Sequence, residues 1–145
     1  MTKTQGYYLE DLSVGIFAEQ KMVVDDAKIS MFAELSQDYN PIHMDAEYAA
    51  TTMFGRRIAH GALSASLISA ILGNDLPGPG AIFVELNLRF RKPAFIDDEI
   101  TARAEVAEIN EKTGRVKMKV ACFVDGKAII RGDAGVVVLR RPEEA

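Results

Sequence analysis

The sequence predicts an α+β fold in which an antiparallel β-sheet wraps around one long apolar helix. Helical patterns fill the first half of the chain and period-two patterns fill the second, so the two kinds are segregated. Residues 58–72 contain no Asp, Glu, Lys or Arg, which is typical of a helix that is buried on all sides. The length of 145 residues is that of one domain, and we expect residues 1–145 to form a single domain.

The first half of the chain contains three helical segments. Apolar residues recur at helical spacing over residues 25–36, and acidic residues occupy the first turn of this segment. The helix must end before Pro41, because the residue before a proline is disfavoured in the α region and Asn-Pro favours a turn. A short helix is predicted over residues 45–52, with Asp45 as its N-cap. The apolar helix should run over residues 60–74 and end at a Gly-Asn signal.

The second half of the chain alternates apolar and polar residues and predicts long strands. The strand over residues 82–90 should bury one apolar face, and the dipeptide Asp125-Gly126 is a strong hairpin signal. The predicted strands cover residues 16–24, 82–90, 97–107, 116–124 and 127–139. The unpaired edge of such a sheet is commonly covered by a second chain, so we expect a homodimer.

Composition narrows the classes of function. The net charge of −4 argues against a nucleic-acid surface, because neutralising phosphates requires an excess of Lys and Arg. A single cysteine, Cys122, excludes an intrachain disulfide and a multi-cysteine zinc site. The uncharged residues 58–74 are fewer than the roughly 20 needed to span a bilayer. We therefore expect a cytoplasmic protein that binds neither membrane nor nucleic acid.

The segment SQDYNPIHMD places two titratable side chains on either side of a bend. Asp38 and His43 are five residues apart, and Asn40-Pro41 between them lets both side chains reach one small volume. A histidine with an ordinary pKa of about 6.5 can act as a base at neutral pH. A carboxyl group acting as an acid needs its pKa raised, which burial in a dry pocket would do. The alternative is structural, since Asp before Asn-Pro is a common turn former.

A second group of polar atoms is expected at the start of the uncharged helix. The first N–H groups of a helix have no partner within it and carry positive potential, so His60-Gly61 marks a ready site for an oxyanion. An ordinary helix start without any such role would give the same sequence. The pattern by itself leaves both interpretations open.

Together the two segments resemble a known family. DYNPIHMD followed by GRRIAHGALSASL is similar to the hydratase motif of the MaoC-like, (R)-specific enoyl-CoA hydratases, which have the hotdog fold. The histidine of I-A-H-G follows His43 by 17 residues, and the similarity extends over about residues 14–138. The paired motifs are far more specific than either one alone.

The resemblance implies a role for each matching residue. Asp38 and His43 would form the catalytic pair, and the Gly61 N–H would contribute to an oxyanion hole. Asn40 would help to orient the pair, and Ser64 would lie near the same pocket. Members of the family are hydro-lyases that add water reversibly across a trans-2-enoyl thioester to give an (R)-3-hydroxyacyl product. They need no metal or redox cofactor, and they form dimers with the site near the interface.

A CoA or phosphopantetheine thioester is anionic, so an acidic protein must provide local positive charge for it. The clusters available are Arg56-Arg57 and the group from Arg89 to Lys92. We expect Arg56, Arg89 and Lys92 to contact the phosphates. Solvated charges on a loop and a strand face explain the same residues equally well.

Three other functions remain open at this point. The chain could dehydrate 3-hydroxyacyl groups on acyl carrier protein, or act on a short or branched acyl-CoA, because the same turn serves that chemistry. A non-catalytic acyl-thioester binding module would be expected to lack Asp38 or His43, but both are present. A thioesterase of the same fold would not account so well for the D-x-N-P-x-H spacing. The length of the acyl chain is not readable from the sequence.

Overall fold

The computed structural model describes residues 6–143 and shows the segregated order of elements that the sequence predicts. The helical segments are η1 (Leu9–Asp11), α1 (Asp26–Ser36), α2 (Pro41–Met44), α3 (Ala46–Ala50) and α4 (Gly61–Asn74). The strands are β1 (Phe17–Val23), β2 (Ile82–Phe90), β3 (Glu99–Ile109), β4 (Arg115–Val124) and β5 (Lys127–Val137).

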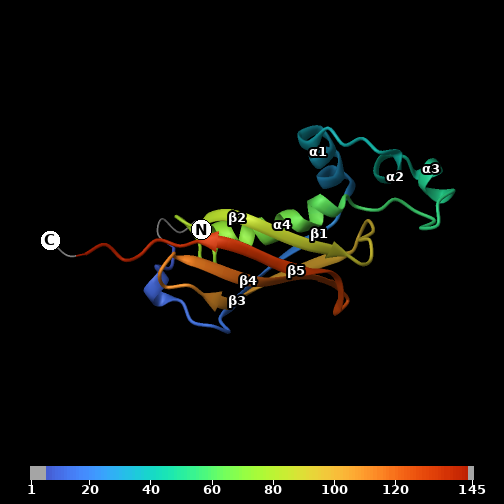
Figure 1. The fold of residues 1–145 in the computed structure, drawn as a ribbon. Coiled ribbons are helices and arrows are strands. Elements are labelled where there is room, and N and C mark those ends of the chain that lie inside the picture. Colours follow the sequence, from blue (N-terminus) through green and yellow to red (C-terminus); the bar gives the residue numbers. More distant parts are fainter. Residues whose placement is uncertain (1–5, 144–145) are drawn as a thin grey trace.

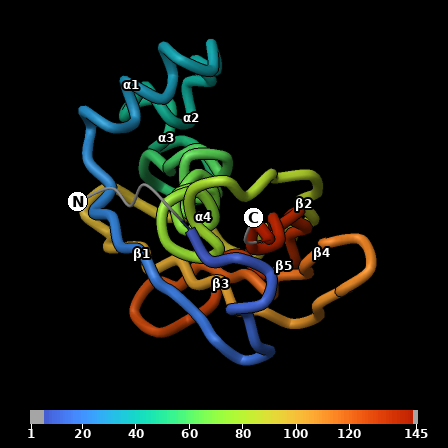
Figure 2. Tube along the Cα trace, turned by 90° about the vertical axis from the view of Figure 1, so that its left-hand side faces the viewer, coloured from blue at the N-terminus to red at the C-terminus, as the bar shows by residue number. Residues whose placement is uncertain are grey.

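The five strands form one antiparallel sheet that curves around α4. Their order is β1-β3-β4-β5-β2, so β1 and β2 are the two edges. Figure 2 shows α4 lying in the hollow of the sheet. Ile68 and Ile71 of α4 are fully buried there, in one core with small residues of β3 such as Ala102 and Ala104. Small side chains on the sheet let the strands approach the helix closely.

The segment from α1 to α3 forms an arm that stands away from the sheet. Figure 1 shows these three helices beyond one end of the strands, near the start of α4. Few side chains of the arm are buried, among them Ile29 and Ala33 of α1. An ion pair of 2.7 Å between Arg57 and Asp26 ties the first turn of α1 to the segment that leads into α4. The arm is therefore held both by polar contacts and by apolar packing, since Ile29 belongs to the core and Phe32 and Met44 pack against it.

The helical signals are confirmed. Asp25 is the N-cap of α1, and Asp45 caps α3 by accepting hydrogen bonds from the N–H groups of Glu47 and Tyr48. The Asp125-Gly126 hairpin is also confirmed, because both residues have the positive φ that a tight turn requires. The helix α4 ends at Asn74 as predicted, but Asp75 is its C-cap and has right-handed geometry. Gly73 is therefore an ordinary helical residue, not a left-handed cap.

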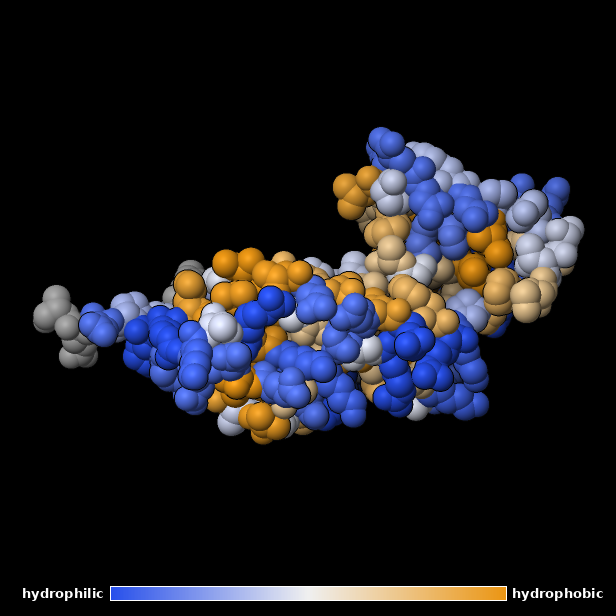
Figure 3. Space-filling model, in the orientation of Figure 1, coloured by the Kyte–Doolittle hydropathy of each residue, from blue (hydrophilic) through white to orange (hydrophobic). Residues whose placement is uncertain are grey.

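The predicted burial of one face of residues 82–90 is wrong for the chain by itself. Leu88 alone is half-buried in β2, and the other eight residues are exposed. Figure 3 shows apolar side chains gathered along this edge of the sheet body. The physical reason is that β2 is an edge strand, with β5 on one side and no strand on the other. The large exposed apolar residues of β2 are Ile82, Phe83, Val84, Leu86 and Phe90.

The prediction that residues 58–72 are buried on all sides is also only partly correct. A stripe of small residues along α4 is exposed, and it consists of Ala62, Ser66, Ser69 and Gly73. This stripe is the face of α4 that the curved sheet does not enclose. No helix in the described part of the chain is long and apolar enough to cross a membrane.

Candidate active site

The loop after α1 presents Asp38. The helix ends where Gln37 adopts a left-handed conformation with φ of 65°, which turns the chain away from the helix axis. The hydroxyl of Ser36 accepts a hydrogen bond from the Asp38 N–H at 3.2 Å. The Asp38 carboxylate in turn accepts one from the Asn40 N–H at 3.1 Å. These local bonds give the carboxylate a defined direction although its side chain is exposed.

His43 is carried by a one-turn helix that the sequence analysis predicted as a bend. Asn40 is the N-cap of α2, where its side chain accepts a hydrogen bond from the Ile42 N–H, and Pro41 is the first helical residue. Asparagine at the N-cap followed by proline is a helix-start signal, so the sequence contained the information for this turn. The structure thus gives Asn40 two contacts, one through its N–H to Asp38 and one to the helix that carries His43.

The ring of His43 is fixed by a backbone carbonyl. Its Nδ1 lies 2.7 Å from the carbonyl oxygen of Ile58, and because a carbonyl can only accept, Nδ1–H must donate. In the neutral ring the lone pair is then on Nε2. Desolvation lowers the pKa of His43 below its ordinary value, and the nearby His60 also lowers it; the Ile58 bond and the Asp38 charge oppose this. The neutral ring is a base ready to accept a proton.

Arg57 holds the backbone of His43 from the other side. Its Nε donates to the His43 carbonyl at 2.6 Å, and the same guanidinium pairs with Asp26. Its side chain is largely buried, so this is a partly desolvated contact of the kind that contributes more than a surface ion pair. The contact joins His43 to both α1 and the segment before α4.

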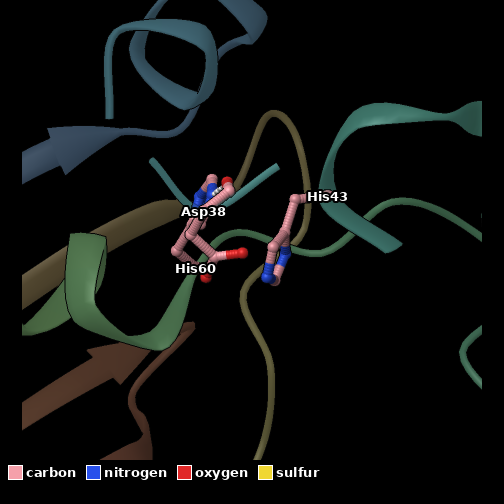
Figure 4. A group of neighbouring side chains, drawn as sticks. All are labelled: Asp38, His43 and His60. Atoms are coloured by element: carbon pink, nitrogen blue, oxygen red, sulfur yellow. Dashed lines mark hydrogen bonds between the residues drawn. The ribbon is translucent and has the colours of Figure 1, made fainter. Parts of the chain in front are cut away.

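His60 was predicted to matter only as part of the helix start, through backbone N–H groups, yet its side chain is at the centre of the cluster. It is only 1% exposed, and its Nε2 donates to the Asp38 carbonyl oxygen at 2.9 Å. Its ring lies on that of His43 with centroids 4.0 Å apart, and the ring of Phe32 packs on it at 4.9 Å. Figure 4 shows the Asp38, His43 and His60 side chains gathered in one place, with a dashed line at the bond between His60 and Asp38. The available signal was the unusual choice of histidine at the start of a helix.

Asp38, His43 and His60 form one compact group. A side-chain nitrogen or oxygen atom from each lies within 4.8 Å of the others. The convergence of Asp38 and His43 expected from the bend is therefore present. The expected burial of Asp38 is not, because the arm is open to solvent on that side in the single chain. Three such groups could also supply ligands to a divalent cation; the absence of a metal cofactor stays a prediction of the sequence.

A pocket of about 360 Å³ opens beside this group. It falls within the size range of small-molecule sites and is mainly apolar, with a few polar groups. Its lining residues are His43, Phe54, Ile58, Ala59, Gly61, Ser64, Phe90, Arg91, Lys92, Pro93, Ala94, Ile129 and Ile130. The pocket therefore places a mainly apolar chamber directly beside the cluster, with His43 in its wall.

The predicted site residues are distributed unevenly around this pocket. His43, Gly61, Ser64 and Lys92 line it. Asp38 and Asn40 lie beside it, in contact with the His43 group through the bonds described above.

The other predicted cations lie elsewhere. The guanidinium of Arg56 stacks on the Phe95 ring at 3.8 Å. Arg89 pairs across the strands with Arg131 and borders a different hollow. Arg91, which was not among the predicted phosphate contacts, lines the pocket instead.

Gly61 begins α4 without a side-chain cap. His60 is the N-cap but makes no capping hydrogen bond, so no side chain covers the N–H groups of the first turn. A Cβ at Gly61 would lie 2.8 Å from the Phe90 ring, which explains why a residue without a side chain fits here. An uncapped helix start at the wall of a pocket can stabilise an oxyanion.

Two other features do not offer comparable chemistry. A larger hollow of about 1070 Å³ at the far end of the sheet is lined by mixed charges, including Glu85, Lys117 and Asp133, and lacks both histidines. The Cys122 thiol is buried, and burial raises its pKa to about 12. It is therefore a protonated core residue and not a nucleophile.

Comparison with known proteins identifies the family. The sequence profile of the MaoC like domain matches residues 15–127, well over half of the chain. The chain belongs to the MaoC-like family. A protein from Rhodospirillum rubrum named (R)-specific enoyl-CoA hydratase is 44% identical over 135 residues, covering 93% of this chain and 94% of the relative. A Methylorubrum extorquens protein named 3-hydroxybutyryl-CoA dehydratase is 41% identical over 136 residues, covering 94% and 87%.

Solved structures agree with this assignment. The unliganded R-hydratase from Pseudomonas aeruginosa superposes with a TM-score of 0.89 at 38% identity, covering 98% of this chain and 94% of that one. The MaoC-like domain therefore has the hotdog fold that the resemblance implied.

The depressed pKa of His43 predicts how the MaoC-like domain responds to pH. Since the folded pKa lies below the unfolded value of 6.5, the unfolded chain binds more protons between these two pH values. The free energy of unfolding should therefore rise with pH across that window. NMR titration of the His43 ring should give a midpoint below pH 6.5. In His43→Asn, the contribution of His43 to the rise of the free energy of unfolding with pH should be absent. A midpoint at or above 6.5 would contradict the buried environment described here.

Proposed function

We propose that the chain reversibly hydrates trans-2-enoyl-CoA to (R)-3-hydroxyacyl-CoA, as a hydro-lyase that spans residues 1–145 as one domain. The observation that carries the proposal is the grouping of His43 and Asp38 at the wall of a mainly apolar pocket. His43 lines this pocket with its Nδ1 fixed by the Ile58 carbonyl, the Asp38 side chain lies within 4.8 Å of it, and the uncapped start of α4 also lines the pocket. Relatives named as hydratases and dehydratases support this choice of reaction.

The proposed chemistry uses one water molecule held between Asp38 and His43. One of the pair takes a proton from this water while the water oxygen attacks C3 of the enoyl group, and the pair gives one proton to C2, so the proton gained from water replaces the one given to the substrate. Both groups lie on one side of the planar enoyl system, so the two additions occur on the same face. The Gly61 N–H would bind the thioester oxygen as it gains negative charge. The bound water is consumed, and the protein ends in its starting protonation state.

The alternatives differ in what the site must contain. A binding module needs no proton-transfer pair, so the assembled Asp38, Asn40 and His43 argue against it. Dehydration of acyl groups on carrier protein or of short and branched acyl-CoA uses the same residues, and only the acyl and carrier contacts would differ. The name of the Methylorubrum extorquens relative favours a CoA thioester.

The first test is hydration itself. Purified protein should remove the conjugated enoyl absorbance of crotonyl-CoA or of longer enoyl-CoA, and comparison with carrier-bound substrates identifies the preferred donor. Asp38→Asn and His43→Ala should each lower kcat by roughly 10²- to 10⁴-fold, the usual contribution of a general acid or base. Asp45→Asn is the matched control, because it makes the same change at a helix cap outside the pocket.

Two results would reject the assignment. One is a kcat that is unchanged in Asp38→Asn and His43→Ala, as it is in the control Asp45→Asn. The other is an inactive wild-type protein across the whole ladder of chain lengths and carriers, which would favour the binding module.

We also propose that Lys92 contacts the phosphates of the thioester donor, with Arg56 and Arg89 as weaker candidates. Lys92 lines the pocket, whereas Arg56 packs on Phe95 and Arg89 lies by another hollow. A cation at the pocket mouth would attract an anionic donor and would act through its charge.

Charge reversal separates these candidates. Lys92→Glu should raise KM at low salt by about tenfold, equivalent to about 1.4 kcal/mol of binding, with little change in kcat. Arg56→Glu and Arg89→Glu should raise KM less, and Lys112→Glu, in the turn at the far end of the sheet, is the control. An unchanged KM in Lys92→Glu would exclude the contact.

A homodimer is the state in which this site should work. The support is the edge strand β2, whose apolar residues are exposed, together with the uncovered stripe of α4. A second copy would cover both and would also close the open side of Asp38. The cytoplasmic location stays a prediction, which rests on the single cysteine.

A substitution on β2 tests the proposed dimer. Leu86→Lys puts a charge on the exposed apolar strand and should shift the protein to a monomer in sedimentation velocity, with a loss of activity. Val14→Lys, an equally drastic change at an exposed residue before β1, is the control and should leave the mass unchanged. A wild-type monomer, or a dimer that persists in Leu86→Lys, would contradict an interface through this strand.

A further inference from the structure

His60 is the side chain that touches both members of the proposed catalytic pair. It donates a hydrogen bond from Nε2 to the Asp38 carbonyl, and its ring lies on the His43 ring at 4.0 Å. The first contact joins residues 22 apart in sequence, so it crosses from the loop after α1 to the start of α4. Phe32 closes the other side of the ring. His60 therefore links the arm to the start of α4.

The N-cap of α4 is an unusual place for such a residue. Asn, Asp, Ser or Thr at an N-cap accepts a hydrogen bond from a free N–H of the first turn and so stabilises the helix. His60 makes no such bond. Its side chain bonds to Asp38 and not to the helix N–H groups. The helix α4 therefore has no side-chain cap, and the loop that carries Asp38 has a hydrogen bond to the start of α4. The same choice leaves the first turn of α4 open to the pocket.

The second ring nitrogen of His60 restricts its tautomer. Nδ1 is the one buried side-chain polar atom without a hydrogen-bond partner among residues 6–143. Nε2 must carry a proton, because the Asp38 carbonyl can only accept. A further proton on Nδ1 would bury a charged donor with no acceptor, which is costly. The two histidines of the site therefore have opposite tautomers, Nδ1–H in His43 and Nε2–H in His60.

We propose that His60 is a positioning residue that holds the Asp38 loop against His43, through its Nε2–H bond to the Asp38 carbonyl and its stacking on the His43 ring. This inference rests on the proposed hydration activity. The bond acts on the backbone of Asp38, so it sets the distance between the two proton-transfer groups without touching the substrate. A displacement of about 1 Å in such a pair can lower a rate by about 10²-fold.

Three variants at His60 separate positioning from simple packing. His60→Gln places an amide N–H where Nε2 now lies, His60→Asn has the same amide but is one methylene shorter, and His60→Leu fills the space without a donor. We expect kcat to fall about tenfold to a hundredfold in the Asn and Leu variants, with KM little changed, and to recover largely in the Gln variant.

Two kinetic results would overturn the proposal. One is a Gln variant as slow as the Leu variant, because the donor would then not matter. The other is a rise in KM with kcat intact, which would place His60 in substrate binding. Circular dichroism and thermal unfolding check that each variant is folded, and the comparison of Gln with Asn uses two side chains of the same chemistry.

NMR of ¹⁵N-labelled histidine tests the inference independently of activity. The chain has only two histidines, so the His43→Ala spectrum assigns both rings. At a pH where both rings are neutral, wild-type protein should show His60 protonated on Nε2 alone and His43 protonated on Nδ1 alone. A His60 ring protonated on Nδ1 would overturn the proposal. An inactive wild type would refute the hydration activity, and the ring spectra would then decide the role of His60.

Discussion

The burial of α4 inside the curved sheet is the constraint on which the rest of the structure depends. A helix with no charged side chain can lie there only if its polar groups are confined to its ends. One of those ends, at Gly61, must therefore emerge where the sheet stops. The wall of the pocket begins at this point, and the arm from α1 to α3 reaches it from outside the sheet. The packing of the core therefore determines where the site lies.

The arm is held at the site by side chains that bond to backbone carbonyls. Three such bonds join residues that are 14, 15 and 22 apart, and they link Arg57 to His43, His43 to Ile58 and His60 to Asp38. A segment with few buried apolar residues obtains only part of its order from the hydrophobic core, here through Ile29 of α1. Because the bonds converge on one group of side chains, the contacts that order the arm also fix the geometry for proton transfer.

The sequence predicts the elements well where local chemistry decides them. Period-two alternation gave the strands, and Asp45 and Asp125-Gly126 marked a cap and a turn through their own side-chain and backbone preferences. Prediction from the sequence fails where the outcome depends on residues that are distant in the chain or belong to a second copy. Alternation shows that β2 has an apolar face, but not whether its own chain or a second copy covers that face. Arg89 and Arg91 are equally basic in sequence, and only the end of β2 brings Arg91 to the pocket.

Several local rules are broken at the site. Gln37 adopts a left-handed conformation that costs a residue with a Cβ about 1 kcal/mol. His60 occupies an N-cap without capping, and its Nδ1 is buried without a partner. These departures lie within one small group of residues, while the core around α4 follows the ordinary rules of packing. Local costs that persist next to a pocket indicate a site that is used.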